Sequence, residues 1–257
     1  MKISFYKYQG TGNDFVMIDG RENQLDLTKK QIQEICDRRF GIGADGVIIL
    51  KNHDDCDFEM DYYNADGSQS FCGNGSRCAQ AFANKIDIVR GDSYFKAIDG
   101  FHHGKAIEYF FATQMKDVDE VQKLEKDYFI HTGSPHYIRY VDDVEKIDVE
   151  KEGAAIRNSE PYKKDGVNVN FVSIGKKVLN VRTFERGVEA ETFSCGTGVT
   201  AVAMSFLVKE NTHQPSVSIK TKGGKLQIDL ERTAEHQFEN VWLIGPAKEV
   251  YAGSIEL

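Results

Sequence analysis

The sequence predicts a mixed α/β (α+β) fold made of two similar halves, each with a set of strands around one central helix. Two observations support this prediction. Short runs in which apolar and polar residues alternate, as they do in strands, occur along the whole 257-residue chain. Each half also contains a Cys-Gly-x-Gly motif that opens an apolar, helix-like segment. A helix that is apolar nearly all round must be enclosed, and a surrounding sheet would enclose it.

The expected strands are short apolar or alternating runs, and they outnumber the expected helices. In chain order they are Ile3 to Tyr8, Phe15 to Ile18, Val47 to Leu50, Phe58 to Tyr63, Tyr94 to Ile98, Ala106 to Phe111, His136 to Tyr140, Val167 to Ile174, Val178 to Phe184, Val217 to Lys220, Leu226 to Leu230 and Val241 to Ile244. The chain is therefore expected to be rich in sheet.

Three helices are expected. The first spans Thr28 to Arg38, because Thr28 and Gln31 have the spacing of a capping box. The other two follow the cysteine motifs, at about Asn74 to Asn84 and Thr197 to Lys209. The last of these is apolar nearly all round and is the stronger candidate for an enclosed helix.

The order of these features repeats weakly along the chain, because in each half strands precede a Cys-Gly-x-Gly motif and its helix. A charged stretch from Gln114 to Lys126 separates the two sets. The chain is long enough for roughly two domains. We therefore expect an N-terminal domain over residues 1–115 and a C-terminal domain over residues 116–248.

Composition favours a small-molecule ligand. The net charge is −8 and the basic residues are scattered, which is atypical of proteins that bind nucleic acid or an anionic membrane surface. The N-terminus lacks the apolar core of a signal peptide, and no stretch approaches the roughly 20 apolar residues of a spanning helix. A soluble, cytoplasmic protein is expected. Its five cysteines, an odd number at irregular spacing, fit a reducing compartment better than a disulfide framework.

Cys72 and Cys195 are the candidate catalytic residues. Each stands directly before Gly-x-Gly at the expected start of a helix, where N–H groups without intrahelical partners and the helix dipole favour a thiolate or a bound anion. Glycines there expose successive N–H groups that can hold a carboxylate. If two such sites bind the same amino-acid substrate, a thiolate on one face can remove the α-proton while a thiol on the opposite face returns a proton to the same carbon. A racemase that uses no cofactor needs this arrangement.

Two other motif interpretations fail. Gly41-Ile-Gly-Ala-Asp-Gly46 matches the dinucleotide pattern G-x-G-x-x-G, but it follows a helix and precedes a strand, the reverse of the required order. Cys72 and Cys78 are separated by too many residues for a zinc knuckle, and no nearby pair of histidines completes a tetrahedral set. Neither a nucleotide site nor a metal site is therefore expected.

Polar residues precede both cysteine motifs. Asn64 stands in a Tyr-Asn-Ala-Asp-Gly turn before Cys72, and Glu185 and Arg186 end a strand before Cys195. Without the cysteines, a turn and a surface ion pair would be the preferred interpretation of these residues.

Several further motifs occur in a specific order along the chain. They are Gly10-Thr-Gly-Asn13-Asp14-Phe15, Asn64-Ala-Asp-Gly67, Cys72-Gly-Asn-Gly-Ser-Arg-Cys78, Gly133-Ser-Pro-His136, Asn168, Glu185-Arg186-Gly187 and Cys195-Gly-Thr-Gly198. With these motifs the chain resembles the diaminopimelate epimerase family over essentially its full length. The resemblance implies two pseudo-symmetric domains, each a mostly antiparallel sheet around a central helix, with the active site in the cleft between them. It also implies that the last strand, residues 249–257, completes the N-terminal domain.

The resemblance implies an isomerase that interconverts L,L- and meso-diaminopimelate in lysine and peptidoglycan precursor biosynthesis, with no pyridoxal phosphate, other cofactor or metal. It also suggests a homodimer. By matched position Cys72 and Cys195 are the two bases. The substrate-binding residues that it implies are Asn13, Asn64, Gly73, Asn74, Asn168, Glu185, Arg186, Gly196 and Thr197, with His136 and Ser134 in support. Among these, the main chain at Gly73, Asn74, Gly196 and Thr197 matches the groups that hold the reacting carboxylate, and Asn64, Asn168 and Arg186 match those that recognise the distal end.

Two positions depart from the family pattern. Ser134 stands where the family commonly has Asn, so one polar contact to the distal end of the substrate is expected to be shorter or replaced by water. Gly46 stands where some members carry a Gln that touches substrate, and that contact is expected to be absent. Neither change affects the two cysteines.

Three other functions are alternatives. A proline or hydroxyproline racemase is similar at Cys-Gly-x-Gly but tends to have His where Asn74 stands, and its substrate has no distal amino acid for Arg186 to recognise. An isomerase that shifts double bonds, like the phenazine-pathway relatives, lacks the paired thiols. A redox sensor would use Cys72 and Cys195 only as a disulfide switch.

Overall fold

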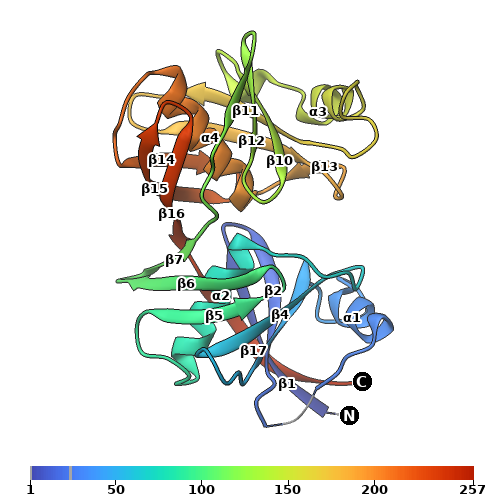
Figure 1. The fold of residues 1–257 in the computed structure, drawn as a ribbon. Coiled ribbons are helices and arrows are strands. Elements are labelled where there is room, and N and C mark those ends of the chain that lie inside the picture. Colours follow the sequence, from blue (N-terminus) through green and yellow to red (C-terminus); the bar gives the residue numbers. More distant parts are fainter. Residues whose placement is uncertain (1, 23–24) are drawn as a thin grey trace. The chain divides into compact units, whose positions relative to one another are not determined.

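The computed structural model describes residues 2–22 and 25–257. The chain forms two compact units (Figure 1). The first unit comprises the chain up to Thr113 together with Gly245–Leu257, and the second unit comprises Gln114–Ile244.

Each unit contains strands and two α-helices. The elements of the first unit are β1 (Lys2–Gly10), β2 (Asn13–Asp19), α1 (Lys29–Cys36), β3 (Gly46–Lys51), β4 (Phe58–Asn64), α2 (Gly73–Lys85), β5 (Ser93–Ala97), β6 (Gly100–Ile107), β7 (Phe110–Gln114) and β17 (Lys248–Glu256). Those of the second are β8 (Val121–Leu124), β9 (Asp127–His131), β10 (Pro135–Tyr140), a 3₁₀ turn (Val144–Lys146), α3 (Val149–Arg157), β11 (Asn168–Ile174), β12 (Leu179–Glu185), β13 (Ala190–Thr192), α4 (Gly196–Lys209), β14 (Ser216–Thr221), β15 (Gly224–Ala234) and β16 (Gln237–Pro246).

The order of strand pairing is the same in both units. Neighbouring strands pair as β17–β1–β2–β3–β4–β5–β6–β7 in the first unit and as β8–β9–β10–β11–β12–β14–β15–β16 in the second. The third and fifth pairs of each series are parallel and the others are antiparallel. A parallel pair needs a crossover. Accordingly, α1 and α3 connect the first parallel pair of their units, and α2 and α4 connect the second.

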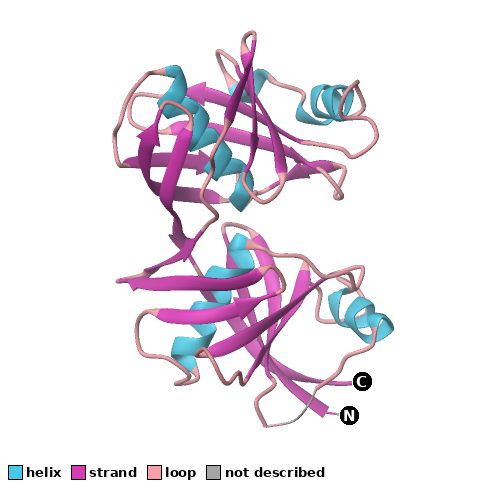
Figure 2. Ribbon diagram, in the orientation of Figure 1, coloured by secondary structure: helices cyan, strands magenta, loops and turns pink. Residues whose placement is uncertain are grey.

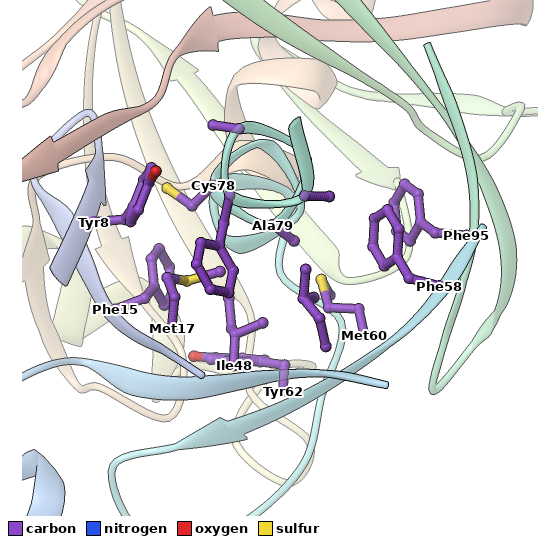
Figure 3. Close-up of a cluster of buried hydrophobic side chains, with 14 of the residues drawn as sticks. Tyr8, Phe15, Met17, Ile48, Phe58, Met60, Tyr62, Cys78, Ala79 and Phe95 are labelled. Atoms are coloured by element: carbon purple, nitrogen blue, oxygen red, sulfur yellow. The ribbon is translucent and has the colours of Figure 1, made fainter. Parts of the chain in front are cut away.

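One helix in each unit is enclosed by strands, namely α2 and α4 (Figure 2). All residues of α2 from Gly73 to Ala83 are buried, and α4 is buried over most of its length. Figure 3 shows Cys78 and Ala79 of α2 among side chains of the surrounding strands, including the stacked rings of Phe58 and Phe95, whose centroids are 5.2 Å apart. The predicted fold of two similar halves around central helices is confirmed.

The first predicted helix begins where its capping signal places it. Thr28 is the N-cap of α1 and forms a capping box with Gln31. The helix ends at Cys36 and not at Arg38, because the carboxylate of Asp37 accepts hydrogen bonds from the main-chain N–H groups of Arg39 and Phe40 and turns the chain.

One part of the prediction is wrong. The run Ala106 to Phe111 is not one strand but the turn of a hairpin, in which Ile107 pairs with Phe110 and Glu108 has a left-handed backbone (φ 51°). An alternating pattern continues through a tight turn when no Gly or Asn marks it. The charged stretch Gln114 to Lys126 also contains strand β8, which has a single fully buried apolar position at Val121.

None of the helices formed by the described residues has both the length and the apolar character needed to span a bilayer.

Candidate active site

Cys72 is the N-cap residue of α2 in the first unit. Its backbone is extended (φ −135°, ψ 111°), and its Sγ accepts a hydrogen bond from the main-chain N–H of Gly75 at 3.4 Å. A Cβ on Gly75 would lie 3.0 Å from Cδ1 of Ile48 and 3.5 Å from Cε1 of Phe15. The second glycine of the motif thus lets the first turn of the helix pack closely against the strands.

Two amide side chains lie beside this thiol. The Sγ of Cys72 is 3.5 Å from Oδ1 of Asn13, and Nδ2 of Asn74 donates to the same oxygen at 3.3 Å. On its other side, Nδ2 of Asn13 donates to Oδ2 of Asp45 at 2.7 Å. The structure therefore brings together the predicted residues Cys72, Asn13 and Asn74, and adds Asp45.

Arg77 lies one turn further along α2 and is fully buried. Its guanidinium donates to the main-chain oxygen of Gly73 at 3.3 Å and to Oδ1 of Asn74 at 2.9 Å. Its Nε is buried without a hydrogen-bond partner, and no carboxylate in the described part of the chain pairs with it. Burial lowers the pKa of Arg77 to about 10, while the nearby thiols of Cys78 and Cys72 favour its charged form.

Cys195 is the N-cap residue of α4 in the second unit (φ −112°, ψ 111°). Its Sγ lies 3.5 Å from Oγ1 of Thr197. A Cβ on Gly198 would lie 2.5 Å from Oδ1 of Asn170 and 3.3 Å from Sγ of Cys195. The glycine after Thr197 therefore makes room for Asn170, a residue that the sequence analysis did not single out.

His136 connects Asn170 to Thr197. Nδ2 of Asn170 donates to the main-chain oxygen of Tyr137 at 3.2 Å, and Oδ1 accepts from the hydroxyl of Thr183 at 2.9 Å. This orientation makes Asn170 a donor to Nδ1 of His136, at 3.2 Å.

A neutral imidazole that accepts at Nδ1 carries its proton at Nε2. Nε2 of His136 then donates to Oγ1 of Thr197 at 2.9 Å. The hydroxyl of Thr197 keeps its own proton and a second lone pair, so it can donate to Sγ of Cys195 or accept from it.

The neutral state of His136 follows from its burial. The side chain is fully buried, and this lowers the pKa of His136 to about 3, with smaller effects from the charges of His131 and Arg186. The imidazole therefore keeps one tautomer across the neutral pH range.

A second group of predicted residues lies at the ends of β10, β11 and β12. Nδ2 of Asn168 donates to the hydroxyl oxygen of Ser134 at 2.8 Å, and Oδ1 accepts from the main-chain N–H of Arg186 at 2.9 Å. The exposed guanidinium of Arg186 donates to the main-chain oxygen of Asp165 at 3.0 Å and to Ser134 at 3.4 Å. In the described residues it forms no ion pair with a carboxylate, so its charge is available to an anionic ligand.

Glu185 and Asn64 are held in place by their own loops. Oε2 of Glu185 accepts a hydrogen bond from the hydroxyl of Thr192 at 2.9 Å. Nδ2 of Asn64 donates to Ser68 and Ser70, and its Oδ1 accepts from the hydroxyl of Tyr62 at 2.9 Å. Asn64 therefore shapes the turn before Cys72, and no hydrogen bond joins it to Asn13 or Asn74.

Three residues of these networks were missed by the sequence analysis. Asp45 lies inside the glycine-rich motif that was examined only as a nucleotide site, and Arg77 lies inside the first cysteine motif. Asn170 follows Asn168 at a spacing of two, which places both amides on one face of β11, and this spacing could have identified it. Within residues 2–22 and 25–257, no group of three or more His, Cys, Asp or Glu side chains is arranged to hold a metal ion.

Comparison with known proteins identifies a family for this chain. The sequence profile of "Diaminopimelate epimerase" matches residues 5–97 and 128–250. A diaminopimelate epimerase from Flavobacterium psychrophilum is 46% identical over 260 residues, which cover 98% of this chain and 100% of that protein.

Solved structures with a similar fold include the following two. A PhzF-family phenazine biosynthesis protein from Bacillus anthracis superposes with a TM-score of 0.78 at 13% identity and covers all of both chains. A hydroxyproline epimerase from Agrobacterium vitis, solved with trans-4-hydroxy-L-proline, has a TM-score of 0.69 at 12% identity over 99% of this chain and 91% of that one. At such identities these structures support the fold alone.

The family profile and the Flavobacterium psychrophilum relative confirm the prediction that this chain is an isomerase. With its two repeated helix starts, each opened by a cysteine, the chain belongs to the diaminopimelate epimerase family.

Proposed function

We propose that this protein interconverts L,L- and meso-diaminopimelate, with Cys72 and Cys195 as the two bases. The observation that carries the proposal is their equivalent position in the repeated fold. Each cysteine is the N-cap of the enclosed helix that connects the two strands of the second parallel pair of its unit. A duplicated fold thus supplies two equivalent thiols, which a reaction at one carbon with two faces requires.

The proposed reaction is balanced in protons. One thiolate takes the α-proton of the substrate and becomes a thiol, and the electron pair of the broken C–H bond delocalises into the carboxylate. The other thiol gives its proton to the opposite face of the same carbon and becomes a thiolate. The reverse reaction exchanges the roles of the two sulfurs, and no electron acceptor is needed.

Main-chain donors are proposed to bind the reacting carboxylate. The N–H groups of Gly73 and Asn74 in α2, and of Gly196 and Thr197 in α4, belong to first helical turns, where the main-chain N–H has no intrahelical acceptor. Such donors stabilise the additional negative charge of the deprotonated intermediate, typically by about 3–4 kcal/mol for each well-placed group.

Side chains near each sulfur are proposed to determine whether that cysteine is a thiol or a thiolate. At Cys195, the hydroxyl of Thr197 accepts from Nε2 of His136 and is proposed to donate its own proton to Sγ, which would stabilise a thiolate. Glu185 is proposed to contact the substrate amino group near the same reacting centre.

Arg186 is proposed to bind the distal carboxylate of the substrate. Its guanidinium has only neutral oxygen partners, and a planar fork binds a carboxylate with two parallel hydrogen bonds. Asn168 and Ser134 hold the end of β12 that carries Arg186. Asn64, in the first unit, is also proposed to bind the distal end of the substrate.

An exchange assay tests the proposal. Purified protein, treated with EDTA and given no cofactor, is incubated in D₂O with L,L-diaminopimelate and, separately, with L-proline. We expect proton NMR to show deuterium at one α-carbon of diaminopimelate together with formation of the meso isomer, and no change in proline. Turnover of proline alone, or inactivity until pyridoxal phosphate is added, would overturn it.

The homodimer suggested by the resemblance and the cytoplasmic location expected from the composition stay predictions. A homodimer would be detected as twice the 29.0 kDa chain mass by light scattering of the purified protein. The cytoplasmic location would be seen by cell fractionation.

A further inference from the structure

Asp45 contacts the amide that faces Cys72. It lies just before β3, in the glycine-rich segment Gly41–Gly46, and nothing in the proposed reaction uses it. Its Oδ2 accepts hydrogen bonds from Nδ2 of Asn13 at 2.7 Å and from the main-chain N–H of Asp14 at 3.2 Å.

The chemistry of a carboxylate decides the orientation of Asn13. An ionised carboxylate only accepts hydrogen bonds, so the group of Asn13 that faces Asp45 must be the NH₂. The oxygen of the same amide must then point the other way, toward Sγ of Cys72 at 3.5 Å.

Asp45 is itself held in place by charged neighbours. The guanidinium of Arg38 donates to Oδ1 of Asp45 at 2.7 Å and to Oδ1 of Asp14 at 2.7 Å. Lys7, which is buried, pairs with the other oxygen of Asp14 at 2.7 Å. Burial alone would raise the pKa of Asp14, but the hydrogen bonds from Arg38 and Lys7 lower it to about 2. The carboxylate of Asp14 therefore stays charged across the neutral range.

Arg77 fixes the second amide from the opposite end. A guanidinium only donates hydrogen bonds, so the group of Asn74 that faces Arg77 must be the oxygen. The NH₂ of Asn74 is left to donate to the oxygen of Asn13, at 3.3 Å. Two charges of opposite sign thus require the same orientation of Asn13.

We propose that Asp45 is a positioning residue that holds the amide oxygen of Asn13 toward Cys72, with Arg77 supporting the same orientation through Asn74. An oxygen can accept from the S–H of a thiol but gives a thiolate no hydrogen bond. The oxygen of Asn13 therefore favours the protonated form of Cys72. The sulfur of this thiol also accepts a hydrogen bond from the main-chain N–H of Gly75. A reversed amide would present N–H to the sulfur and favour the thiolate. The role of Cys72 as a proton donor rests on the proposed function, whereas the proposed orientation of the Asn13 amide does not.

Other titratable groups lie near this network, and none of them is substituted in the variants of the test. They are Arg77 and Cys78 on α2, Tyr8 on β1, Asp14 on β2, Tyr62 on β4, and His102 on β6, which stacks on Phe71.

The test measures the alkylation of Cys72 against pH in the full-length protein. Iodoacetamide labelling between pH 5 and 10 is quantified by mass spectrometry of the peptide that contains Cys72, for the native protein, Asp45→Asn, Asn13→Ala and the double variant. Asp61→Asn is the matched control, because Asp61 pairs with Lys51 and has no contact with Asn13. Cys56, a half-buried thiol of the same unit, is the internal reference.

We expect the pH midpoint of Cys72 labelling to fall by about one unit in Asp45→Asn, because a hydrogen bond to a charged group contributes about 1.5–3 kcal/mol, equivalent to one or two pH units. It should also fall in Asn13→Ala, and Asp45→Asn should cause no further shift in the Asn13→Ala background. Asp61→Asn and the Cys56 midpoint should not change.

Three results would overturn the proposal. An unchanged midpoint in folded Asp45→Asn would show that the carboxylate does not control the amide. An equal shift in both backgrounds would show that Asp45 acts by its charge through space and not through Asn13. Asn13→Ala alone decides the matter if Asp45→Asn does not fold, since an unchanged midpoint there also contradicts the proposal. Labelling needs no turnover, so these results are independent of whether diaminopimelate is the substrate.

Discussion

His136 illustrates how one buried side chain sets the chemistry of its neighbours. It is neutral because it is buried, and its tautomer is decided by Asn170, whose own orientation is decided by a main-chain carbonyl. The lone histidine in Gly133-Ser-Pro-His136 carries no sign of this in the sequence. Cys72, Cys195 and Asn13 could be selected from motifs because they stand in recognisable contexts. Asp45 could not, because Asn13 and Asp14, the residues that give it a role, lie 32 and 31 positions away in the sequence.

The buried imidazole should make the protein sensitive to acid. The pKa of His136 is about 3 in the folded chain and near 6.5 when unfolded, so between these values the unfolded state binds more protons and stability falls as pH falls. The loss is about 1.4 kcal/mol for each pH unit below 6.5, or about 3 kcal/mol at pH 4.5. Urea denaturation of the native protein and of His136→Gln at pH 7.5 and 4.5 measures this difference. Equal losses in the two proteins would show that His136 is not responsible.

Arg186 provides a test of substrate recognition at a single residue. Replacing it by Lys keeps the charge but removes the planar fork, so one of two hydrogen bonds to the distal carboxylate is lost. We expect KM for diaminopimelate to rise about tenfold while kcat changes less, since a hydrogen bond to a charged group contributes about 1.5 kcal/mol or more. Arg139→Lys is the control, because Arg139 already pairs with Asp127 in the same unit. An unchanged KM in Arg186→Lys would remove the residue from recognition.

At the scale of elements, signals that are local in sequence predicted local structure well. The capping box located the start of α1, and the apolar segments after the cysteines located α2 and α4. Helix α3 was missed because Gly153 and its charged residues hide the pattern, although α3 occupies the same position in the second unit as α1 does in the first. The turn at Glu108 was missed because its left-handed residue is neither Gly nor Asn.

The glycines that start α2 and α4 should differ in their tolerance of a methyl group. In Gly198→Ala the new Cβ would lie 2.5 Å from Oδ1 of Asn170, which is held by Thr183 and cannot move away easily. In Gly75→Ala it would lie 3.0 Å from the end of the Ile48 side chain, which has more freedom. We expect Gly198→Ala to lower the free energy of unfolding by about 1–3 kcal/mol and Gly75→Ala by less. Thermal unfolding followed by circular dichroism compares them, and the reverse ranking would contradict this explanation.

At the scale of the whole molecule, the central feature is a fold that occurs twice. Both units repeat the same strand order, the same two parallel pairs and the same two crossover helices, although the sequence repeat is visible only at Cys-Gly-x-Gly. The pairing order could not be predicted, because short strands carry no information about their neighbours. The surroundings of the two cysteines have diverged within this frame. Cys72 faces an amide oxygen and Cys195 faces a hydroxyl, which suits the proposed reaction, in which the two sulfurs begin in different protonation states.

The central claim is that one thiol from each unit takes part in the same proton exchange. The most direct measurement is the rate of meso-diaminopimelate formation from the L,L isomer in D₂O by folded Cys72→Ala and Cys195→Ala, compared with Cys56→Ala. We predict that each of the first two variants loses epimerisation by at least about 10³-fold, because each lacks a base that contributes on the order of 10² to 10⁴ in rate, and that Cys56→Ala is as active as the native protein. Turnover near the native rate in either Cys72→Ala or Cys195→Ala would contradict the two-base account.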